Sequence, residues 1–182
     1  MQLRKDITLA DITIEKLEVK DIALLREVAV GAYADHYLDL WHDGGKWYLE
    51  QYFSEQRLTA ELTDPNAAFY LAFYNNLPAG FLKLNINAPL ESKQDKNALE
   101  LERVYLKKNF EGKSVGAKLV ELTFEIAKRE NKDLVWLKAM DTGQGPISFY
   151  KKMGFEVYGT HLLKHTLMKE ELRGMVVMVK VL

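Results

Sequence analysis

The chain has 182 residues, 48% of them hydrophobic and 28% charged, which is enough for one domain with a full core. The formal net charge of -1 gives no electrostatic reason to expect a nucleic acid or an anionic membrane as partner. The absence of cysteine excludes disulfides, thiolate metal ligands and cysteine nucleophiles, and it fits a cytoplasmic location. Residues 1–11 lack a secretory-signal pattern, and no segment approaches the roughly 20 apolar residues that span a bilayer.

The first half of the chain alternates between strand and helix patterns. Apolar and polar residues alternate over 7–17, as in a strand, and an apolar face repeats at helical spacing over 21–33. After the Gly44-Gly45 break we expect two short helices, the second capped by Ser54. Two apolar runs, 67–74 and 78–87, flank Asn75-Asn76 and predict a β-hairpin.

The second half predicts a loop, then strands separated by helices. The expected order is a loop at 88–97, a strand at 98–106, a helix at 115–130, a strand at 134–140, a turn at 141–146, a helix at 147–153 ended by Gly154, and strands at 155–161 and 175–182. No linker, repeat or low-complexity stretch divides the chain. We therefore expect a single α/β domain over residues 1–182, with a mixed sheet.

The turn between the strand at 98–106 and the helix that follows is the most informative segment. It runs Glu111-Gly112-Lys113-Ser114-Val115-Gly116-Ala117. A small-residue turn that leads into a helix presents backbone N–H groups to a phosphate. A Walker loop is disfavoured, because that motif needs a glycine where this chain has Lys107. The turn can also be an ordinary connection whose lysines serve solubility.

A second segment, 147–155, combines a short helix, a glycine stop and an aromatic residue. Phe149, Met153 and Phe155 are expected in the core whatever the protein does. Tyr150 lies beside that apolar face and carries a hydroxyl group, so it is the residue of this segment with an unexplained polar group.

Together the two segments resemble the Gcn5-related N-acetyltransferase (GNAT) superfamily. There a strand is followed by Gln/Arg-x-x-Gly-x-Gly/Ala and a helix, and later by Phe-Tyr-x-x-x-Gly-Phe. Glu111, Ser114 and Gly116 occupy the first motif, and Tyr150, Gly154 and Phe155 match the second. The resemblance implies a mixed sheet of about six or seven strands, splayed at an acetyl-CoA cleft and flanked by about four or five helices.

The N-terminal half narrows the resemblance to bacterial polyamine acetyltransferases of the PaiA type. It is carried by Tyr33, Tyr37, Tyr48-Leu49, Phe53, Leu58, Glu61-Leu62 and the runs 69–72, 80–85 and 99–105. This resemblance implies a small-molecule amine acceptor such as spermidine or spermine. Acceptor specificity changes readily within one fold, so acetylation of another small amine, amino acid or peptide amine stays open.

The resemblance also implies site residues. Acetyl-CoA is expected to contact Val104, Tyr105, Leu106, Glu111, Gly112, Lys113, Ser114, Val115, Gly116, Ala117, Gln144, Phe149 and Lys152. Tyr150 is the expected acid for the leaving thiolate, and Glu102, then Glu100, the expected bases. Both carboxylates fall on one strand face; an ion pair with a neighbouring cation is the alternative role for Glu102.

Three departures from the family pattern affect the cofactor site. Glu111 is acidic near a diphosphate, Ser114 replaces a glycine, and Gly145 lacks the asparagine side chain that contacts the pantetheine arm. Gln144 could substitute for that asparagine. If Ser114 adopts a positive φ, it costs more there than glycine would. These departures keep open a CoA-binding module with little catalysis.

The acceptor side and the assembly are less defined. Asp35, Asp39, Asp43 and Glu50 can be a polyamine wall or a solvated acidic face. The aromatic cluster Trp41, Trp47, Tyr48, Tyr52 and Phe53 can line a cleft or pack helices. No metal site is expected, since His161 and His165 lack partners. The exposed final strand is compatible with a homodimer.

Overall fold

The computed structural model describes residues 11–93 and 96–182. The described part forms one open seven-stranded sheet in the order β1-β2-β3-β4-β5-β7-β6. All neighbouring strands are antiparallel except β4 and β5, which are parallel. Residues 7–10 of the first expected strand lie outside the described residues. The mixed open sheet confirms the expected fold class.

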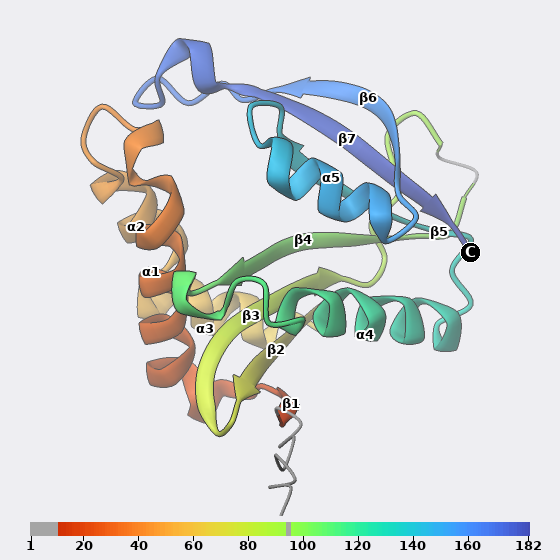
Figure 1. Cartoon of the computed structure of the whole chain (residues 1–182), viewed down its shortest axis with the longest axis horizontal. Helices are drawn as coiled ribbons and strands as arrows, with labels where there is room; N and C mark the ends of the chain where they lie inside the picture. Colours follow the sequence, from red (N-terminus) through yellow and green to blue (C-terminus); the bar gives the residue numbers. More distant parts are fainter. Residues whose placement is uncertain (1–10, 94–95) are drawn as a thin grey trace, which may run out of the picture.

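The elements follow the predicted order (Figure 1). The strands are β1 (Ile12–Lys16), β2 (Ala67–Tyr74), β3 (Leu77–Asn85), β4 (Ala98–Leu106), β5 (Leu134–Met140), β6 (Glu156–Leu162) and β7 (Gly174–Val181). The α-helices of the described part are α1 (Ile22–Tyr37), α2 (Lys46–Tyr52), α3 (Glu55–Thr63), α4 (Val115–Arg129) and α5 (Gln144–Lys152).

Local sequence signals explain several element ends. Asn75 and Asn76 adopt φ of 48° and 64°, the left-handed turn that a two-residue hairpin requires. The Ser54 hydroxyl accepts a hydrogen bond from the Arg57 N–H at 3.3 Å, which caps α3 as predicted. Helix α5 begins at Gln144, earlier than expected, because Pro146 falls in its first turn, where backbone N–H groups have no helical partner.

Two apolar cores lie on opposite faces of the sheet. Helices α4 and α5 cover one face through residues such as Leu119 and Ile147, and Phe155, which follows α5, packs in the same core. Helices α1 to α3 cover the other face of β2 to β4, where Leu25 and Phe53 are fully buried. Figure 1 shows α4 and α5 roughly parallel to each other, one on either side of β4 in this view.

The sheet opens between β4 and β5. Their register extends only from Ala98–Leu134 to Glu100–Trp136. Beyond Glu100, strand β4 stays paired with β3 alone, and the pairing of β3 with β4 skips Glu102, which forms a β-bulge. The remaining edge of β4 therefore faces a gap in the sheet.

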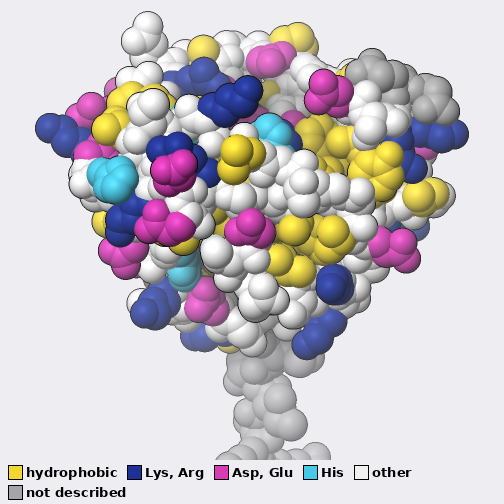
Figure 2. Space-filling view, turned by 90° about the horizontal axis from the view of Figure 1, so that it is seen from above, with side chains coloured by type: hydrophobic (Ala, Val, Ile, Leu, Met, Phe, Trp, Pro, Cys, Tyr) yellow, Lys and Arg dark blue, Asp and Glu magenta, His cyan; other side chains and the backbone are white. Residues whose placement is uncertain are grey.

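The face seen in Figure 2 mixes charges of both signs with apolar side chains. Its acidic and basic residues alternate and form no large patch of one sign. None of the described helices is long and apolar enough to cross a membrane.

Candidate active site

Two cavities meet where β4 and β5 separate. The first, of about 390 Å³, has four tyrosines of α1 and α2 in its wall, together with residues of β4, β5 and the segment between β6 and β7, and we call it the tyrosine cavity. The second, of about 660 Å³, lies against the turn before α4, and we call it the turn cavity. The residues common to both walls are Tyr37, Val104, Tyr105, Pro146 and Tyr150. A ligand in one cavity can therefore contact a ligand in the other.

The turn cavity is built from the strand end and the helix start that the sequence singled out. Of the predicted cofactor residues, its walls include Val104, Tyr105, Leu106, Glu111, Gly112, Ser114, Val115, Gly116, Ala117 and Phe149. Gly145 also lines it, and a Cβ atom at that position would meet no atom within 4 Å. Gly145, which stands where the family has an asparagine, therefore leaves the cavity wider.

Three predicted cofactor residues lie outside those walls. The Lys113 ammonium group lies over the rings of Tyr74 and Phe110, at 5.0 and 5.7 Å from their centroids. The Gln144 amide donates to the backbone carbonyl of Asp141 at 3.3 Å. Lys152 is exposed near the end of α5. An anion in the turn cavity would consequently meet backbone N–H groups rather than a lysine.

The backbone of the turn explains its small residues. Gly112 has φ of 70° and Ser114 has φ of 65°, both left-handed. Ser114 is the N-cap residue of α4, yet its hydroxyl makes no capping hydrogen bond. The first N–H groups of α4 are thus left for a ligand, and the helix dipole favours a negative charge there.

The turn cavity includes one basic side chain, His36, that was not predicted from the sequence as a site residue. His36 of α1 places its Nε2 atom 3.0 Å from the carbonyl oxygen of Leu106 and 3.5 Å from the Glu111 carboxylate. Glu111 thus has a neighbour that can offset its charge when the imidazole is protonated. His36 and Glu111 are 75 positions apart, and no repeating pattern of residues predicts their contact.

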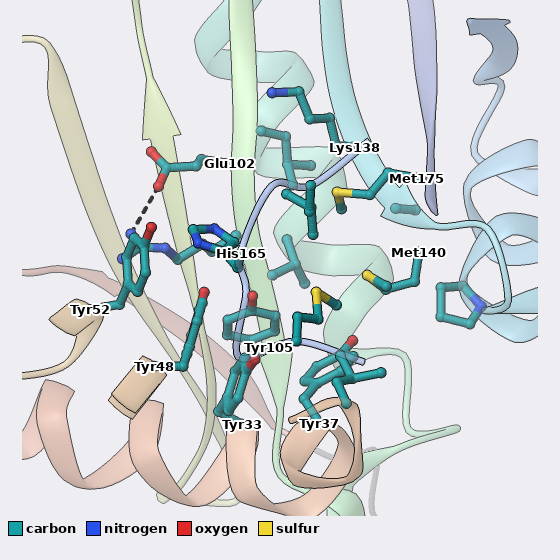
Figure 3. A pocket seen from close by; sticks show the side chains of 18 of the residues that line it. Tyr33, Tyr37, Tyr48, Tyr52, Glu102, Tyr105, Lys138, Met140, His165 and Met175 are labelled. Atoms are coloured by element: carbon teal, nitrogen blue, oxygen red, sulfur yellow. Dashed lines mark ion pairs between the residues drawn. The ribbon is translucent and has the colours of Figure 1, made fainter. Parts of the chain in front are cut away.

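The tyrosine cavity is walled by stacked aromatic rings (Figure 3). Tyr33 and Tyr48 stack at 4.3 Å between centroids, and Tyr48 and Tyr52 at 4.5 Å. The Trp41 indole N–H donates to the Tyr33 hydroxyl at 2.8 Å. Of the predicted aromatic cluster, Trp41, Tyr48 and Tyr52 line the cavity, whereas Phe53 is fully buried in the core. The cluster therefore serves as both cavity wall and helix packing.

Two carboxylates from β4 face the same cavity, as their spacing predicts. Glu100 and Glu102 both line it, and both accept a hydrogen bond from the Asn85 amide nitrogen, at 2.8 and 2.7 Å. The four acidic residues considered for a polyamine wall lie elsewhere. Asp35 accepts from the Lys108 N–H and Asp43 from the Gly45 and Trp47 N–H groups, while Asp39 and Glu50 are exposed.

The surroundings of the two carboxylates differ. Glu102 binds the Lys83 ammonium at 2.7 Å through one oxygen and the Arg103 guanidinium at 2.9 Å through the other. Glu100 contacts no cation within ion-pair distance among the described residues. Burial raises the pKa of Glu100, and the Glu102 charge adds to that rise, against the Asn85 hydrogen bond. Glu100 is therefore the carboxylate better suited to accept a proton near neutral pH.

Tyr150 lines both cavities from α5. Its ring packs against Phe149 and Phe155 at 5.2 and 5.7 Å between centroids. Burial raises the pKa of its hydroxyl, so the group stays protonated at neutral pH. None of the side-chain hydrogen bonds found among the described residues uses that hydroxyl. It is available as a proton donor at the junction of the cavities.

The connection between β6 and β7 covers the tyrosine cavity next to α2, where the His165 ring packs against Trp47 at 5.3 Å between centroids. Trp41 forms an isolated β-bridge with Met168, and the His42 N–H donates to the carbonyl of Leu167 at 2.9 Å. His165 of this connection and Lys138 of β5 line the cavity, and neither was predicted. Within residues 11–93 and 96–182, no group of three His, Asp or Glu side chains could hold a metal ion.

Comparisons with known proteins agree with this arrangement. A family model described as "Acetyltransferase (GNAT) family" matches residues 29–155. An uncharacterized N-acetyltransferase in the pepI 3' region of Lactobacillus delbrueckii subsp. lactis is 30% identical over 115 residues, 63% of this chain and 66% of that protein, just under two thirds. The spermidine N(1)-acetyltransferase of Thermoplasma acidophilum is 28% identical over 161 residues, 82% of this chain and 91% of that protein.

A solved structure supports the fold. The crystal structure of the PaiA N-acetyltransferase from Thermoplasma acidophilum, in complex with coenzyme A, superposes with a TM-score of 0.75. It is 24% identical and covers 94% of this chain and 99% of its own. The family match, extending over more than half of the chain and including the turn and Tyr150, shows that the protein belongs to the GNAT acetyltransferase family.

Proposed function

We propose that this single-domain protein transfers the acetyl group of acetyl-CoA to a primary amine, and that the acceptor is an aliphatic polyamine such as spermidine or spermine. The observation that carries the proposal is the junction of two cavities at Tyr150, one suited to a diphosphate and the other to a cation. Family membership and the 28% identity to a spermidine acetyltransferase support the same assignment.

The turn cavity fits acetyl-CoA. Uncapped N–H groups at the start of α4, between Ser114 and Ala117, suit the diphosphate. The edge of β4 from Leu101 to Leu106 is not paired with β5 and can bind the amides of the pantetheine arm as an added strand would. Acetyl-CoA supplies the activated thioester.

The proton transfers are assigned to groups at the junction. The acceptor nitrogen attacks the thioester carbonyl, so a C–N bond forms, the C–S bond breaks and one proton leaves the nitrogen. Glu100 takes that proton, directly or through water, since both oxygens of Glu102 are held by cations. Tyr150 gives its proton to the departing thiolate.

The tyrosine cavity fits a cationic acceptor. Its aromatic walls can bind an ammonium group through cation–π contacts. Among the charged wall residues, Glu100 and Glu102 are opposed by Arg103 and Lys138, so the net charge of the wall does not select the acceptor. The features that favour an amine are the aromatic walls and Glu100, whose carboxylate forms no ion pair among the described residues.

A thiol-release assay with a panel of amines tests the proposal. We expect spermidine and spermine to release CoA faster than amino acids, peptide amines or aminoglycosides. CoA release with one of those other amines but not with polyamines would show that the acceptor is that amine and not a polyamine. Intact CoA binding without thiol release from any amine would instead favour a CoA-binding module.

The Tyr150→Phe variant tests the acid role. We expect kcat to fall by about 100-fold, because a positioned acid contributes at least that much, with the KM for acetyl-CoA changed little. Tyr158→Phe is the matched control, since Tyr158 is an exposed tyrosine of β6 outside both cavities. Unchanged turnover in Tyr150→Phe would remove the tyrosine from the mechanism.

A further inference from the structure

A buried cluster of charges connects α3 to the tyrosine cavity. Glu61 of α3, 7% exposed, accepts hydrogen bonds from the Arg103 guanidinium at 2.9 and 3.1 Å. The same carboxylate lies 3.2 Å from the Lys83 ammonium group. Both cations also bind Glu102, so two carboxylates share two buried cations. Glu61 also accepts a hydrogen bond from the exposed Arg57 side chain, one turn earlier in α3, at 2.7 Å.

The β-bulge makes this sharing possible. Because the ladder skips Glu102, the side chains of Glu102 and Arg103 reach the same face of the sheet although they are neighbours in sequence. Lys83 lies opposite Arg103 in the register of β3 with β4. Glu61 and Glu102 balance the two buried cations, Lys83 and Arg103, and Glu61 also pairs with the exposed Arg57. Glu100 is the carboxylate of this group without an ion-pair partner among the described residues.

We infer that Glu61 is a positioning residue, which holds Lys83 and Arg103 against Glu102 and thereby keeps one oxygen of Glu100 free to accept the proton of the acceptor amine. This inference rests on the proposed function, in which Glu100 is the base. Removing the charge of Glu61 would leave two buried cations with one partner carboxylate. An unpaired buried cation is costly, so the cations would turn towards Glu102 and Glu100.

The groups that face Glu100 determine in which direction each substitution should shift its pKa. Lys83 and Asn85 come from β3, Glu102 and Arg103 from β4 and Lys138 from β5, and Tyr48, Tyr52 and His165 line the same cavity. Burial is the largest influence and raises the pKa of Glu100, and repulsion from Glu102 raises it further. The Asn85 hydrogen bond and the charges of Lys138 and Lys83 lower the pKa. One added positive charge must therefore lower this pKa, and one lost positive charge must raise it.

Four variants separate this role from a merely structural one. Glu61→Gln removes the buried anion, Lys83→Met removes a cation, and the double variant restores the balance. Glu55→Gln is the control, since Glu55 lies on the same helix but is exposed. The pKa of Glu100 is read by ¹³C NMR of the side-chain carboxyl, assigned with Glu100→Gln, and by the acid limb of the pH profile of kcat/KM.

We expect Glu61→Gln to lower the pKa of Glu100 by about one pH unit and Lys83→Met to raise it by a similar amount, in keeping with the effect of one charge at close range. The double variant should return it to the wild-type value, and Glu55→Gln should leave it there. If Glu61→Gln does not fold, a comparison of Lys83→Met with the double variant still shows whether the charge of Glu61 shifts the pKa of Glu100. A Glu100 carboxyl that titrates alike in all variants overturns the inference.

The NMR measurement keeps the two proposals distinguishable. If the wild type acetylates no amine, the proposed function fails, while the carboxyl titrations still show whether Glu61 controls Glu100. If the wild type is active and Glu61→Gln lowers kcat without moving the carboxyl titration or the pH profile, the function stands and the positioning role is wrong.

Discussion

Replacing Ser114 with glycine should stabilise the protein. Ser114 has φ of 65° and ψ of 3°, and its exposed side chain makes no capping hydrogen bond. A residue with a Cβ costs about 1–2 kcal/mol in this conformation, whereas glycine adopts it freely. The larger unfolded-state entropy of glycine cancels about 0.5–1 kcal/mol of that gain. The net increase in the free energy of unfolding should be about 0.5–1 kcal/mol.

Urea unfolding of both proteins measures this difference, and a thermal melt should rise by about 2–4 °C per kcal/mol for a chain of this size. Gly112→Ala is the converse control. Its φ is 70° and a Cβ there would meet no atom within 4 Å, so any loss of stability is conformational. If Ser114→Gly is no more stable than the wild type while Gly112→Ala is destabilised, the assigned backbone strain at Ser114 is wrong.

Three other substitutions test the site. Glu111→Gln should tighten CoA binding by roughly 3- to 10-fold in calorimetry, because removing a like charge near the surface is worth about 1 kcal/mol; weaker binding would mean that Glu111 acts mainly by holding His36. Gly80→Ala should lower the free energy of unfolding by about 1–3 kcal/mol, since its Cβ would clash with the backbone carbonyl of Tyr105. A wild-type urea midpoint would contradict this contact. Glu100→Gln should be more stable than the wild type at pH 7.5 but not at pH 4. Burial raises the pKa of Glu100, so the wild-type protein becomes less stable as the pH rises through that pKa, whereas glutamine does not ionise. An equal difference in stability at both pH values would exclude the ionisation of Glu100 as its cause.

Local patterns predicted most of the fold. The hairpin at Asn75-Asn76 and the cap at Ser54 follow from residues that are adjacent in sequence, and the apolar spacing of α4 follows from its buried face. The start of α5 was missed because Gly145 and Pro146 are typical of turns, although the first helical turn accepts both.

The charge arrangement of the site could not be predicted in the same way. Glu61 and Arg103 are 42 positions apart, and their contact depends on the packing of α3 against the sheet. The bulge at Glu102 shifts the apolar positions of β4 from Leu99 and Leu101 to Val104 and Leu106, and it decides which charges share a face. The strand prediction treated 98–106 as regular and did not use this change of phase. His165 reaches the cavity through an irregular connection, for which no periodicity exists.

The departures from regular structure coincide with the chemistry. Strands β4 and β5 separate after Glu100, the ladder skips Glu102, and Ser114 takes a backbone conformation that suits glycine. Each has a cost in stability, and each leaves a group accessible: a strand edge, a carboxylate or a helix N-terminus. The apolar packing of α1 to α5 against the sheet offsets these costs. Continued pairing of β4 with β5 beyond Glu100 would close the gap in the sheet where the two cavities meet.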